Sequence, residues 1–154
     1  MKLGTLATAT TAAFAGGALL TQIVIVPSWQ AASPEAFLAR FATEGPATGA
    51  TVFPFELASL ILTTIAAFRR PAWPWVGATA CLIGTFALLA YFVPANLALL
   101  DPGFPPGDVA RALADWNRWD WVRAGLAVAA AGFAATARLR SDVPADQRAY
   151  SGSG

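Results

Sequence analysis

Four long apolar stretches, separated by short segments rich in proline, glycine and charge, dominate the pattern of this chain. The hydrocarbon core of a membrane is about 30 Å thick, and a helix needs roughly 17–25 residues to cross it. All four stretches reach that length, the second and the fourth only just. The pattern therefore predicts four membrane-spanning helices, at about residues 3–26, 52–68, 76–93 and 121–137.

The segments between these stretches carry helix start and stop signals. Ser33-Pro34-Glu35 has the form of an N-cap followed by a first-turn proline and an acid. It predicts a short outer helix over about 34–43, stopped by Gly45-Pro46. Pro27 and Pro94 are expected to end the first and third spans, because proline has no N–H for a helical hydrogen bond.

The last helix is expected to be unusually long. Asp108 is a good N-cap, and from there the pattern runs helical without a break to about Arg138. At 1.5 Å per residue this helix measures about 46 Å, so we expect it to project beyond the bilayer on the outer side. The predicted fold is an all-α, integral membrane four-helix bundle forming one domain, 1–150. Residues 151–154 have the composition of a flexible linker.

Composition and charge fix the environment and the orientation. Of the 154 residues, 56% are hydrophobic and only 12% are charged, which leaves little for a separate soluble domain. Positive residues mark the cytoplasmic face of a membrane protein, so both termini are predicted to be cytoplasmic. One lysine against nine arginines, with much alanine, is typical of a high-GC bacterium and predicts its inner membrane. The residues that cluster on the predicted inner side are Lys2, Arg69, Arg70, Arg138 and Arg140.

Several classes of function are disfavoured by what the chain lacks. The net charge is +1 and no basic stripe is interleaved with aromatic residues, so we predict no binding of nucleic acid. The sequence has no histidine, which removes the commonest metal and haem ligand, and we predict no metal and no cofactor. Cys81 is alone and lies inside the third span, where it is expected to pack as a small apolar residue.

The few strongly polar groups that enter the membrane fall at a similar depth. Each of the four spans brings one or more of them to the outer third, namely Gln22, Glu56, Asn96, Asp120 and Arg123. Polar groups inside a bilayer are costly and usually face a bundle interior, where they find partners. Their convergence favours a site between the helices.

Each of these residues also has a structural interpretation. Glu56 follows Pro54 closely and suits the first turn of a helix, where the dipole favours an acid. Asp120 and Arg123 are spaced i, i+3 and can satisfy each other. Asn96 can cap a helix end, and Gln22 can form a hydrogen bond between helices.

Three features of the chain resemble a known family. They are the Gly- and Thr-rich first span ending at Pro27, the run Pro94-Ala95-Asn96-Leu97, and the run Trp116-Asn117-Arg118-Trp119-Asp120-Trp121-Val122-Arg123. Over about residues 3–138 the layout resembles the small four-span membrane family that includes the anthrone oxygenases of polyketide pathways. Members of that family often have a histidine near the position of Asp120, and this chain has none.

The resemblance implies an oxygenase that needs no cofactor and acts on a flat, apolar aromatic such as an anthrone or a quinol. Arg123 and Asn96 would stabilise the anion of the substrate, and Glu56 or Asp120 would take its proton. The residues expected to bind the substrate are Gln22, Tyr91, Trp116 and Trp119.

Two further classes of function remain open. The chain can be a non-catalytic scaffold or accessory subunit, with the fourth helix and the Pro-rich outer loop as its docking surface. Transport is a third class, although the spans lack paired charges and broken helices. The predicted partners are the lipid bilayer, a small apolar aromatic, and a second copy or another membrane protein. An enzyme should have a cavity that Arg123 faces, whereas a scaffold should have Arg123 paired and the space filled.

Overall fold

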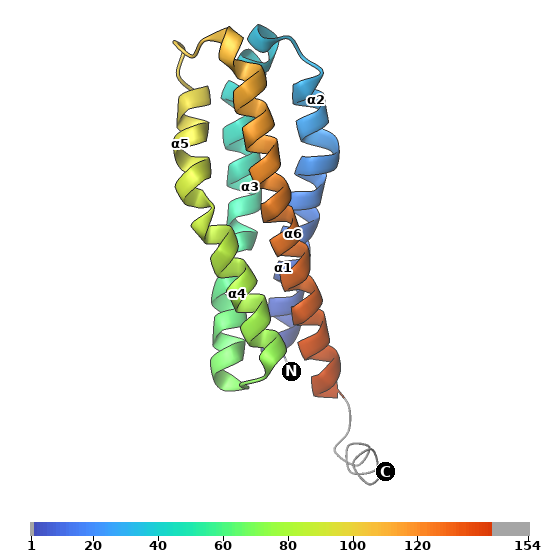
Figure 1. The fold of residues 1–154 in the computed structure, drawn as a ribbon. Coiled ribbons are helices and arrows are strands. Elements are labelled where there is room, and N and C mark those ends of the chain that lie inside the picture. Colours follow the sequence, from blue (N-terminus) through green and yellow to red (C-terminus); the bar gives the residue numbers. More distant parts are fainter. Residues whose placement is uncertain (1, 143–154) are drawn as a thin grey trace.

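The chain is helical along nearly all of the part that the computed structural model describes, residues 2–142. Short turns divide it into four long helical segments, and each segment runs antiparallel to the one before it (Figure 1). The start of the first segment and the end of the last lie together at one end of the bundle, which we call the termini end; the opposite end is the loop end. The elements are α1 (Lys2–Leu20), η1 (Thr21–Ile25), α2 (Val26–Gln30), α3 (Pro34–Arg69), α4 (Trp73–Ala87), α5 (Leu89–Leu99), η2 (Pro106–Asp108) and α6 (Val109–Asp142).

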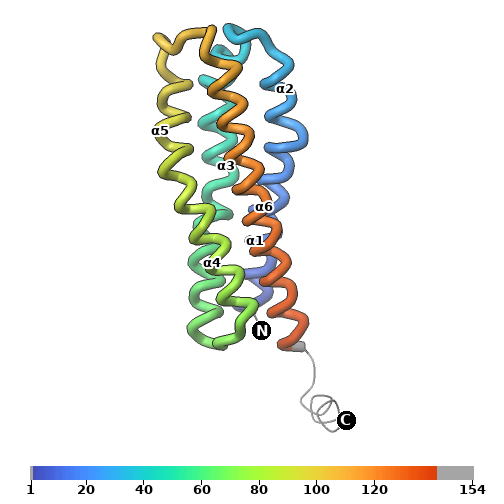
Figure 2. The backbone as a smooth tube through the Cα atoms, in the orientation of Figure 1, coloured from blue at the N-terminus to red at the C-terminus, as the bar shows by residue number. Residues whose placement is uncertain are grey.

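The four segments are arranged as a ring. Helix α1 packs against α3 and α6, and α4 packs against the same two helices (Figure 2). Helices α3 and α6 therefore face each other across the centre of the bundle. A side chain from α3 can meet one from α6 only through the interior, and this arrangement positions the site described below.

The interior at the termini end is built from small residues. Five alanines on one face of α6 are fully or almost fully buried: Ala124, Ala127, Ala130, Ala134 and Ala137. Helix α1 presents Ala7, Thr11 and Ala18 in the same way. Small side chains let helix backbones approach closely, and this kind of packing is typical of helices in lipid, where no hydrophobic force drives them together.

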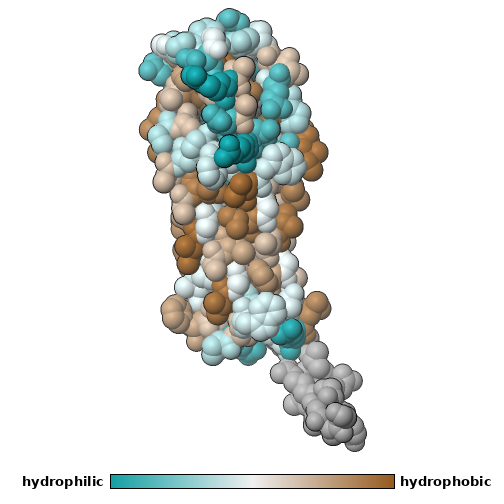
Figure 3. Space-filling view, in the orientation of Figure 1, coloured by the Kyte–Doolittle hydropathy of each residue, from teal (hydrophilic) through white to brown (hydrophobic). Residues whose placement is uncertain are grey.

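Many large apolar side chains point outward, although Phe14, Phe37 and Leu82 are among those fully buried. Ile23 is 64% exposed and Phe68 is 85% exposed. All four segments are long and apolar enough to cross a membrane. Figure 3 shows hydrophobic residues across the middle of one face, with hydrophilic residues gathered towards the two ends. A surface of this kind is compatible with a lipid environment. The four apolar segments confirm the number of helices predicted from the sequence.

The prediction that prolines end the helices was wrong. The first segment passes Pro27 and ends at Gln30, and the third passes Pro94 and ends at Leu99. Just before Pro27 the chain winds as a π-helix over Thr21–Ile25, so that the N–H of Val26 bonds to the carbonyl of Thr21. A π-helical turn holds one residue more than an α-helical turn, so one extra residue is accommodated just before Pro27.

The short outer helix 34–43 and the span 52–68 are parts of one helix. The N-cap was predicted correctly, since Ser33 accepts a hydrogen bond from the N–H of Ala36. The helix then continues through Pro46 and Pro54 to Arg69. Both prolines are exposed, as are Pro27 and Pro94. A proline on the outer face lets a helix curve around its neighbours, and packing on the inner face offsets the lost hydrogen bond.

Helix α6 has the predicted length but does not project alone. It runs for 34 residues, and α3, with 36, is just as long. At the loop end, Phe37 and Phe41 of α3 belong to the same core as Leu113 and Trp116 of α6, together with Trp29 of α2. The outer part of the fourth helix is therefore covered by its neighbours, and all four segments extend towards the loop end together (Figure 1).

Two of the four segments change their winding part-way along. The first contains the π-helical turn, and the third is divided at Leu88 between α4 and α5, whereas α3 carries Pro54 without a break. Counted at 1.5 Å per residue, Leu88 and Pro54 lie about 22 Å from the termini end and the π-helical turn about 29–35 Å from it. Helix α6 is continuous from Val109 to Asp142.

Candidate functional site

A buried arginine between two buried carboxylates lies at the centre of the bundle. Nη2 of Arg123 on α6 is 2.8 Å from Oε2 of Glu56 on α3, and its Nη1 is 3.4 Å from Oδ1 of Asp120. Both carboxylate side chains are 0% exposed, and the arginine side chain is 15% exposed. The guanidinium also lies over the rings of Phe14 and Phe92. The bond between Arg123 and Glu56 joins the two helices that face each other across the ring.

Gln22 extends this network to the π-helical turn. Its side-chain N–H groups reach Oδ2 of Asp120 at 3.0 Å and the carbonyl of Asn117 at 3.3 Å. The network therefore links the first, second and fourth segments. With one arginine and two carboxylates, it carries one more formal negative charge than positive. An uncompensated charge away from water is costly, so an occupant that brings a proton or a positive charge would be favoured here.

Three atoms of the network have no hydrogen-bond partner within the protein. They are Oε1 of Glu56, Oε1 of Gln22 and Nε of Arg123, and all three are buried. Leaving a buried polar atom without a partner costs about 1–3 kcal/mol. One further buried atom without a partner among the described residues, Oγ1 of Thr79, lies outside the network, so most of this cost falls within the buried ion-pair network.

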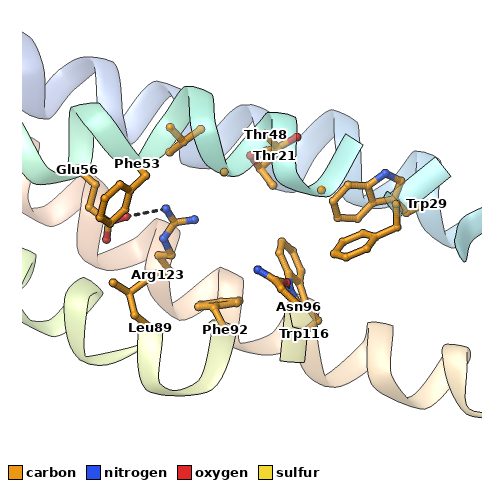
Figure 4. Close-up of a pocket in the computed structure, with 14 residues that line it drawn as sticks. Thr21, Trp29, Thr48, Phe53, Glu56, Leu89, Phe92, Asn96, Trp116 and Arg123 are labelled. Carbon is orange, nitrogen blue, oxygen red and sulfur yellow. Dashed lines mark hydrogen bonds and ion pairs between the residues drawn. The ribbon is translucent and has the colours of Figure 1, made fainter. Parts of the chain in front are cut away.

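A cavity of about 110 Å³ adjoins the network on the side of the loop end. Figure 4 shows Glu56 and Arg123 at one end of this space and Trp29 and Trp116 at the other. Apart from the ion pair, aromatic rings and small residues form most of its wall. The lining residues are Thr21, Trp29, Phe41, Gly45, Thr48, Gly49, Val52, Phe53, Glu56, Leu89, Phe92, Asn96, Trp116 and Arg123.

Asn96 and Trp116 are held to each other on the cavity wall. The indole N–H of Trp116 donates to Oδ1 of Asn96 at 2.9 Å. Beyond them, Trp29 packs edge-on against Trp116, and its own N–H donates to Glu44 at 2.8 Å. Each indole thus has a polar partner, and the rings form a rigid aromatic end to the cavity.

A groove on the outside of the bundle adjoins the same wall. It measures about 280 Å³ and runs between the first segment and α3. Three residues line both the groove and the cavity: Thr21, Thr48 and Val52. Only these side chains are common to the internal space and to an outer face that is largely apolar. They form the boundary between the cavity and the groove.

The structure brings together most of the predicted site residues. Glu56, Asn96, Trp116 and Arg123 all line the cavity. Asp120 and Gln22 belong to the buried network behind it and do not line it. The depth argument from sequence therefore placed these groups correctly relative to one another.

Tyr91 and Trp119 lie elsewhere. Their rings pack against each other with centroids 5.7 Å apart, and neither residue lines the cavity. Tyr91 is adjacent to Phe92, which does line it, so the side chain that faces the cavity is the next one along α5. Trp119 also lies beside the guanidinium of Arg118. These two residues form part of the outer packing and are not part of the cavity wall.

The sequence analysis missed the wall contributed by α3. The segment 44–51 was interpreted as a loop because of Gly45-Pro46, so no side chain from it was considered for the site. In the structure Gly45, Thr48 and Gly49 line the cavity. The signal that could have revealed them is the spacing of small residues at i, i+3 and i+4, which places them on one helix face.

Most of the buried hydroxyl groups of the spans donate within their own helices, and Oγ1 of Thr79 is a buried exception without a partner. Thr11 donates to the carbonyl of Ala7, Thr63 to Ser59 and Thr85 to Leu82. They therefore pack as small residues and do not form a polar path towards the termini end. Among residues 2–142, no three His, Cys, Asp or Glu side chains come together as a group that could hold a metal ion.

Comparisons of the chain with models of protein families, with curated proteins and with solved structures found no match. The function must therefore be inferred from the chemistry of the site itself.

Proposed function

We propose that this chain is a membrane-embedded enzyme that removes a proton from a small apolar aromatic and lets the resulting anion react with molecular oxygen. The observation that carries the proposal is the buried ion pair of Glu56 and Arg123 on the wall of an aromatic-lined cavity. A carboxylate and a cation side by side can accept a proton and stabilise the negative charge left behind.

The charge of the network supports an acidic substrate. With Glu56 and Asp120 against a single Arg123, the site has an excess of one negative charge. A phenol, a quinol or the activated methylene of an anthrone is neutral when it binds and can pass its proton to a carboxylate, which moves the excess charge onto the substrate beside Arg123. Aromatic walls favour a flat ring, because ring faces and edges pack well against one another.

The proposed reaction balances without a redox cofactor. Glu56 takes a proton from the methylene carbon, and the electron pair moves to the carbonyl oxygen of the substrate as an oxyanion that Arg123 stabilises. Because Oδ1 of Asn96 accepts from Trp116, its amide nitrogen is the atom left to donate to that oxyanion. The electron-rich carbon then reacts with oxygen, and one CH2 and one O2 give one carbonyl and one water. The oxygenase part of this scheme also rests on the resemblance of the Asn96 and Trp116–Arg123 runs to anthrone oxygenases.

The size of the cavity limits how a substrate can lie. At about 110 Å³ it is smaller than the roughly 150 Å³ cavity known to hold benzene. A single ring would fill it, and a fused three-ring anthrone would extend past Thr21, Thr48 and Val52 into the adjoining groove. A substrate dissolved among lipid chains would reach the site by the same route.

We also propose the inner membrane of a bacterium as the location, with both termini in the cytoplasm. The arginines at the termini end support this orientation, because positive residues favour the cytoplasmic side. The carboxylates and tryptophans of the loop end would then lie at the outer surface.

Oxygen uptake by the purified protein in detergent, with anthrone and separately with a quinol, tests the proposal. We expect protein-dependent uptake that falls at least 100-fold in Glu56→Gln, the order of effect of losing a general base. Asn96→Ala should also lower the rate. Glu35→Gln, which alters an exposed acid far from the cavity, is the matched control and should keep full activity. No uptake above the spontaneous rate from folded protein would remove this proposal.

A non-catalytic scaffold or accessory subunit is the second candidate, and the pairing of Arg123 with two carboxylates favours it. In that case the network only locks helices together. Replacing Glu56, Asp120 and Arg123 together by apolar residues of similar size should then leave folding and partner binding intact. The fourth helix is a weaker docking surface than predicted, because α2 and α3 cover its outer part.

A further inference from the structure

A second cavity lies at the termini end, far from the site described above. It measures about 230 Å³, and all four helical segments contribute to it. Leu3 and Gly4 come from α1, Trp75 from α4, and the remaining lining residues from the ends of α3 and α6: Ala66, Arg69, Arg70, Arg138 and Ser141.

Three of the lining residues are arginines. Arg69 and Arg70 end α3, and Arg138 lies in the last turns of α6, where its Nε donates to the hydroxyl of Thr5. Within residues 2–142, this end of the bundle has one acidic residue, Asp142 at the end of α6, against five basic ones: Lys2, Arg69, Arg70, Arg138 and Arg140. The nearest described carboxylate along α3 is Glu56, about 20 Å away at 1.5 Å per residue. The cavity is therefore a local concentration of positive charge at the end of an otherwise apolar bundle.

The floor of this cavity is apolar. Trp75 is buried beneath the arginines, with Ala66 and Leu3 beside it. The Trp75 ring and the stem of Arg138 lie next to Gly4 on the first helix, where an added Cβ would meet both at ordinary contact distance. An occupant would meet guanidinium groups at the rim and hydrocarbon below.

Exposed apolar side chains surround the rim. Phe68, Trp73 and Leu139, neighbours of the lining residues, are all more than half exposed. Side chains of this kind are suited to contact with lipid chains, and a basic rim next to them is suited to a lipid phosphate. A free anion would use the arginines and leave this apolar surround without a role.

We propose that Arg69, Arg70 and Arg138 form a binding site for the phosphate group of an anionic phospholipid, with the acyl chains lying against Phe68 and Leu139. Arginine suits the role because its planar fork donates two parallel hydrogen bonds to phosphate oxygens. The site draws on residues about 20 Å from the ion pair of Glu56, so it does not depend on the proposed reaction.

Thermal unfolding and native mass spectrometry of the whole chain in detergent test the proposal. Phosphatidylglycerol is added in one arm, phosphatidylcholine in a second, and inorganic phosphate in a third. We expect phosphatidylglycerol alone to raise the unfolding temperature and to remain bound in the mass spectrum. The double variant Arg69→Gln/Arg70→Gln should weaken its binding by about fivefold or more for each arginine.

Two further variants make the result specific. Arg138→Gln removes the third arginine from a different helix and should also weaken binding, so the conclusion does not depend on one variant folding. Arg111→Gln is the matched control, because that arginine lies at the loop end with its side chain 79% exposed and pairs only with Asp108. It should leave lipid binding unchanged.

Three results would overturn the proposal. One is an equal effect of phosphatidylcholine, a zwitterion with the same phosphate, which would mean that the net negative charge of the lipid is not recognised. Another is full reproduction of the shift by inorganic phosphate, which would make a soluble anion the ligand. The third is an equal loss of binding in Arg111→Gln, which would mean that overall charge, and not this cavity, attracts the lipid.

Discussion

At the scale of single residues, Arg123 connects all four helical segments. It contacts two carboxylates and two aromatic rings, and three of these four neighbours, Glu56, Phe14 and Phe92, come from the other three segments. A buried ion pair is weak evidence for stability, because taking the charges out of water costs about as much as their attraction returns. The loss of one partner is different, since it leaves the others buried and charged.

We expect Arg123→Ala to destabilise the protein by about 3–5 kcal/mol, because Glu56 and Asp120 would remain buried beside each other without a cation. Thermal unfolding in detergent measures the change. Arg111→Ala, at an exposed pair, should change stability by less than about 1 kcal/mol. If Arg123→Ala is as stable as the Arg111 variant, the ion pair is not buried as the structure places it.

The polar residues of the site could be predicted from sequence because the bilayer makes depth informative. Glu56 and Arg123 were expected near each other, because the two side chains lie at a similar depth in their spans and a charge in a membrane needs a partner. Their direction around each helix was harder to predict. Phe92, not Tyr91, faces the cavity, because the third segment is interrupted at Leu88 and periodicity does not carry across such a break.

At the scale of elements, rules for helix ends worked at the starts and failed at the stops. The N-cap at Ser33 was predicted, whereas Pro27, Gly45-Pro46 and Pro94 do not end helices. Local propensity disfavours proline in a helix by about 3 kcal/mol, but contacts made along the whole inner face offset that amount. This is why the part of the cavity wall formed by Gly45, Thr48 and Gly49 of α3 was not predicted.

Two glycines on the α3 wall should respond differently to alanine. A Cβ on Gly45 would lie 2.9 Å from the ring of Phe41, which packs against Trp29, while a Cβ on Gly49 meets nothing within 4 Å. We expect Gly49→Ala to stabilise the protein by up to about 1 kcal/mol through helix propensity. Gly45→Ala should be the less stable of the two by about 1–3 kcal/mol, because the ring must move.

Chemical or thermal unfolding of the two variants, made in the same background, gives the comparison. Equal stability would mean that Phe41 moves aside without disturbing the aromatic end of the cavity. That result would contradict the tight packing of Trp29 on Phe41.

At the scale of the whole molecule, the number of apolar helices and the all-α class followed directly from hydrophobic lengths. The order of helices around the ring did not, because the lengths say nothing about neighbours. Only the structure shows that α3 and α6 face each other, and hence that one bond crosses the centre.

Cysteine labelling tests the proposed orientation. Cys81 is first replaced by serine, and single cysteines are placed at Gly103 in the loop before α6 and at Arg70 between α3 and α4. In intact cells a membrane-impermeant maleimide should label Gly103→Cys and reach Arg70→Cys only after the membrane is opened. The reverse pattern would invert the orientation, and labelling of both from outside would contradict a membrane-spanning bundle.

The mechanical character of the bundle follows from where its helices are interrupted. One helix free of proline, α6, carries both Asp120 and Arg123, while the first segment has a π-helical turn and the third is divided at Leu88. Pro27, Pro46, Pro54 and Pro94 also lie between the middle of the bundle and the loop end, and each lacks the N–H of a helical hydrogen bond. Bending there disturbs fewer hydrogen bonds than bending in the alanine-packed half, so compliance is concentrated in the half that holds the cavity. A sideways load on the loop end, from a bulky guest or from a bilayer of different thickness, is taken up in that half before the alanine-packed half moves.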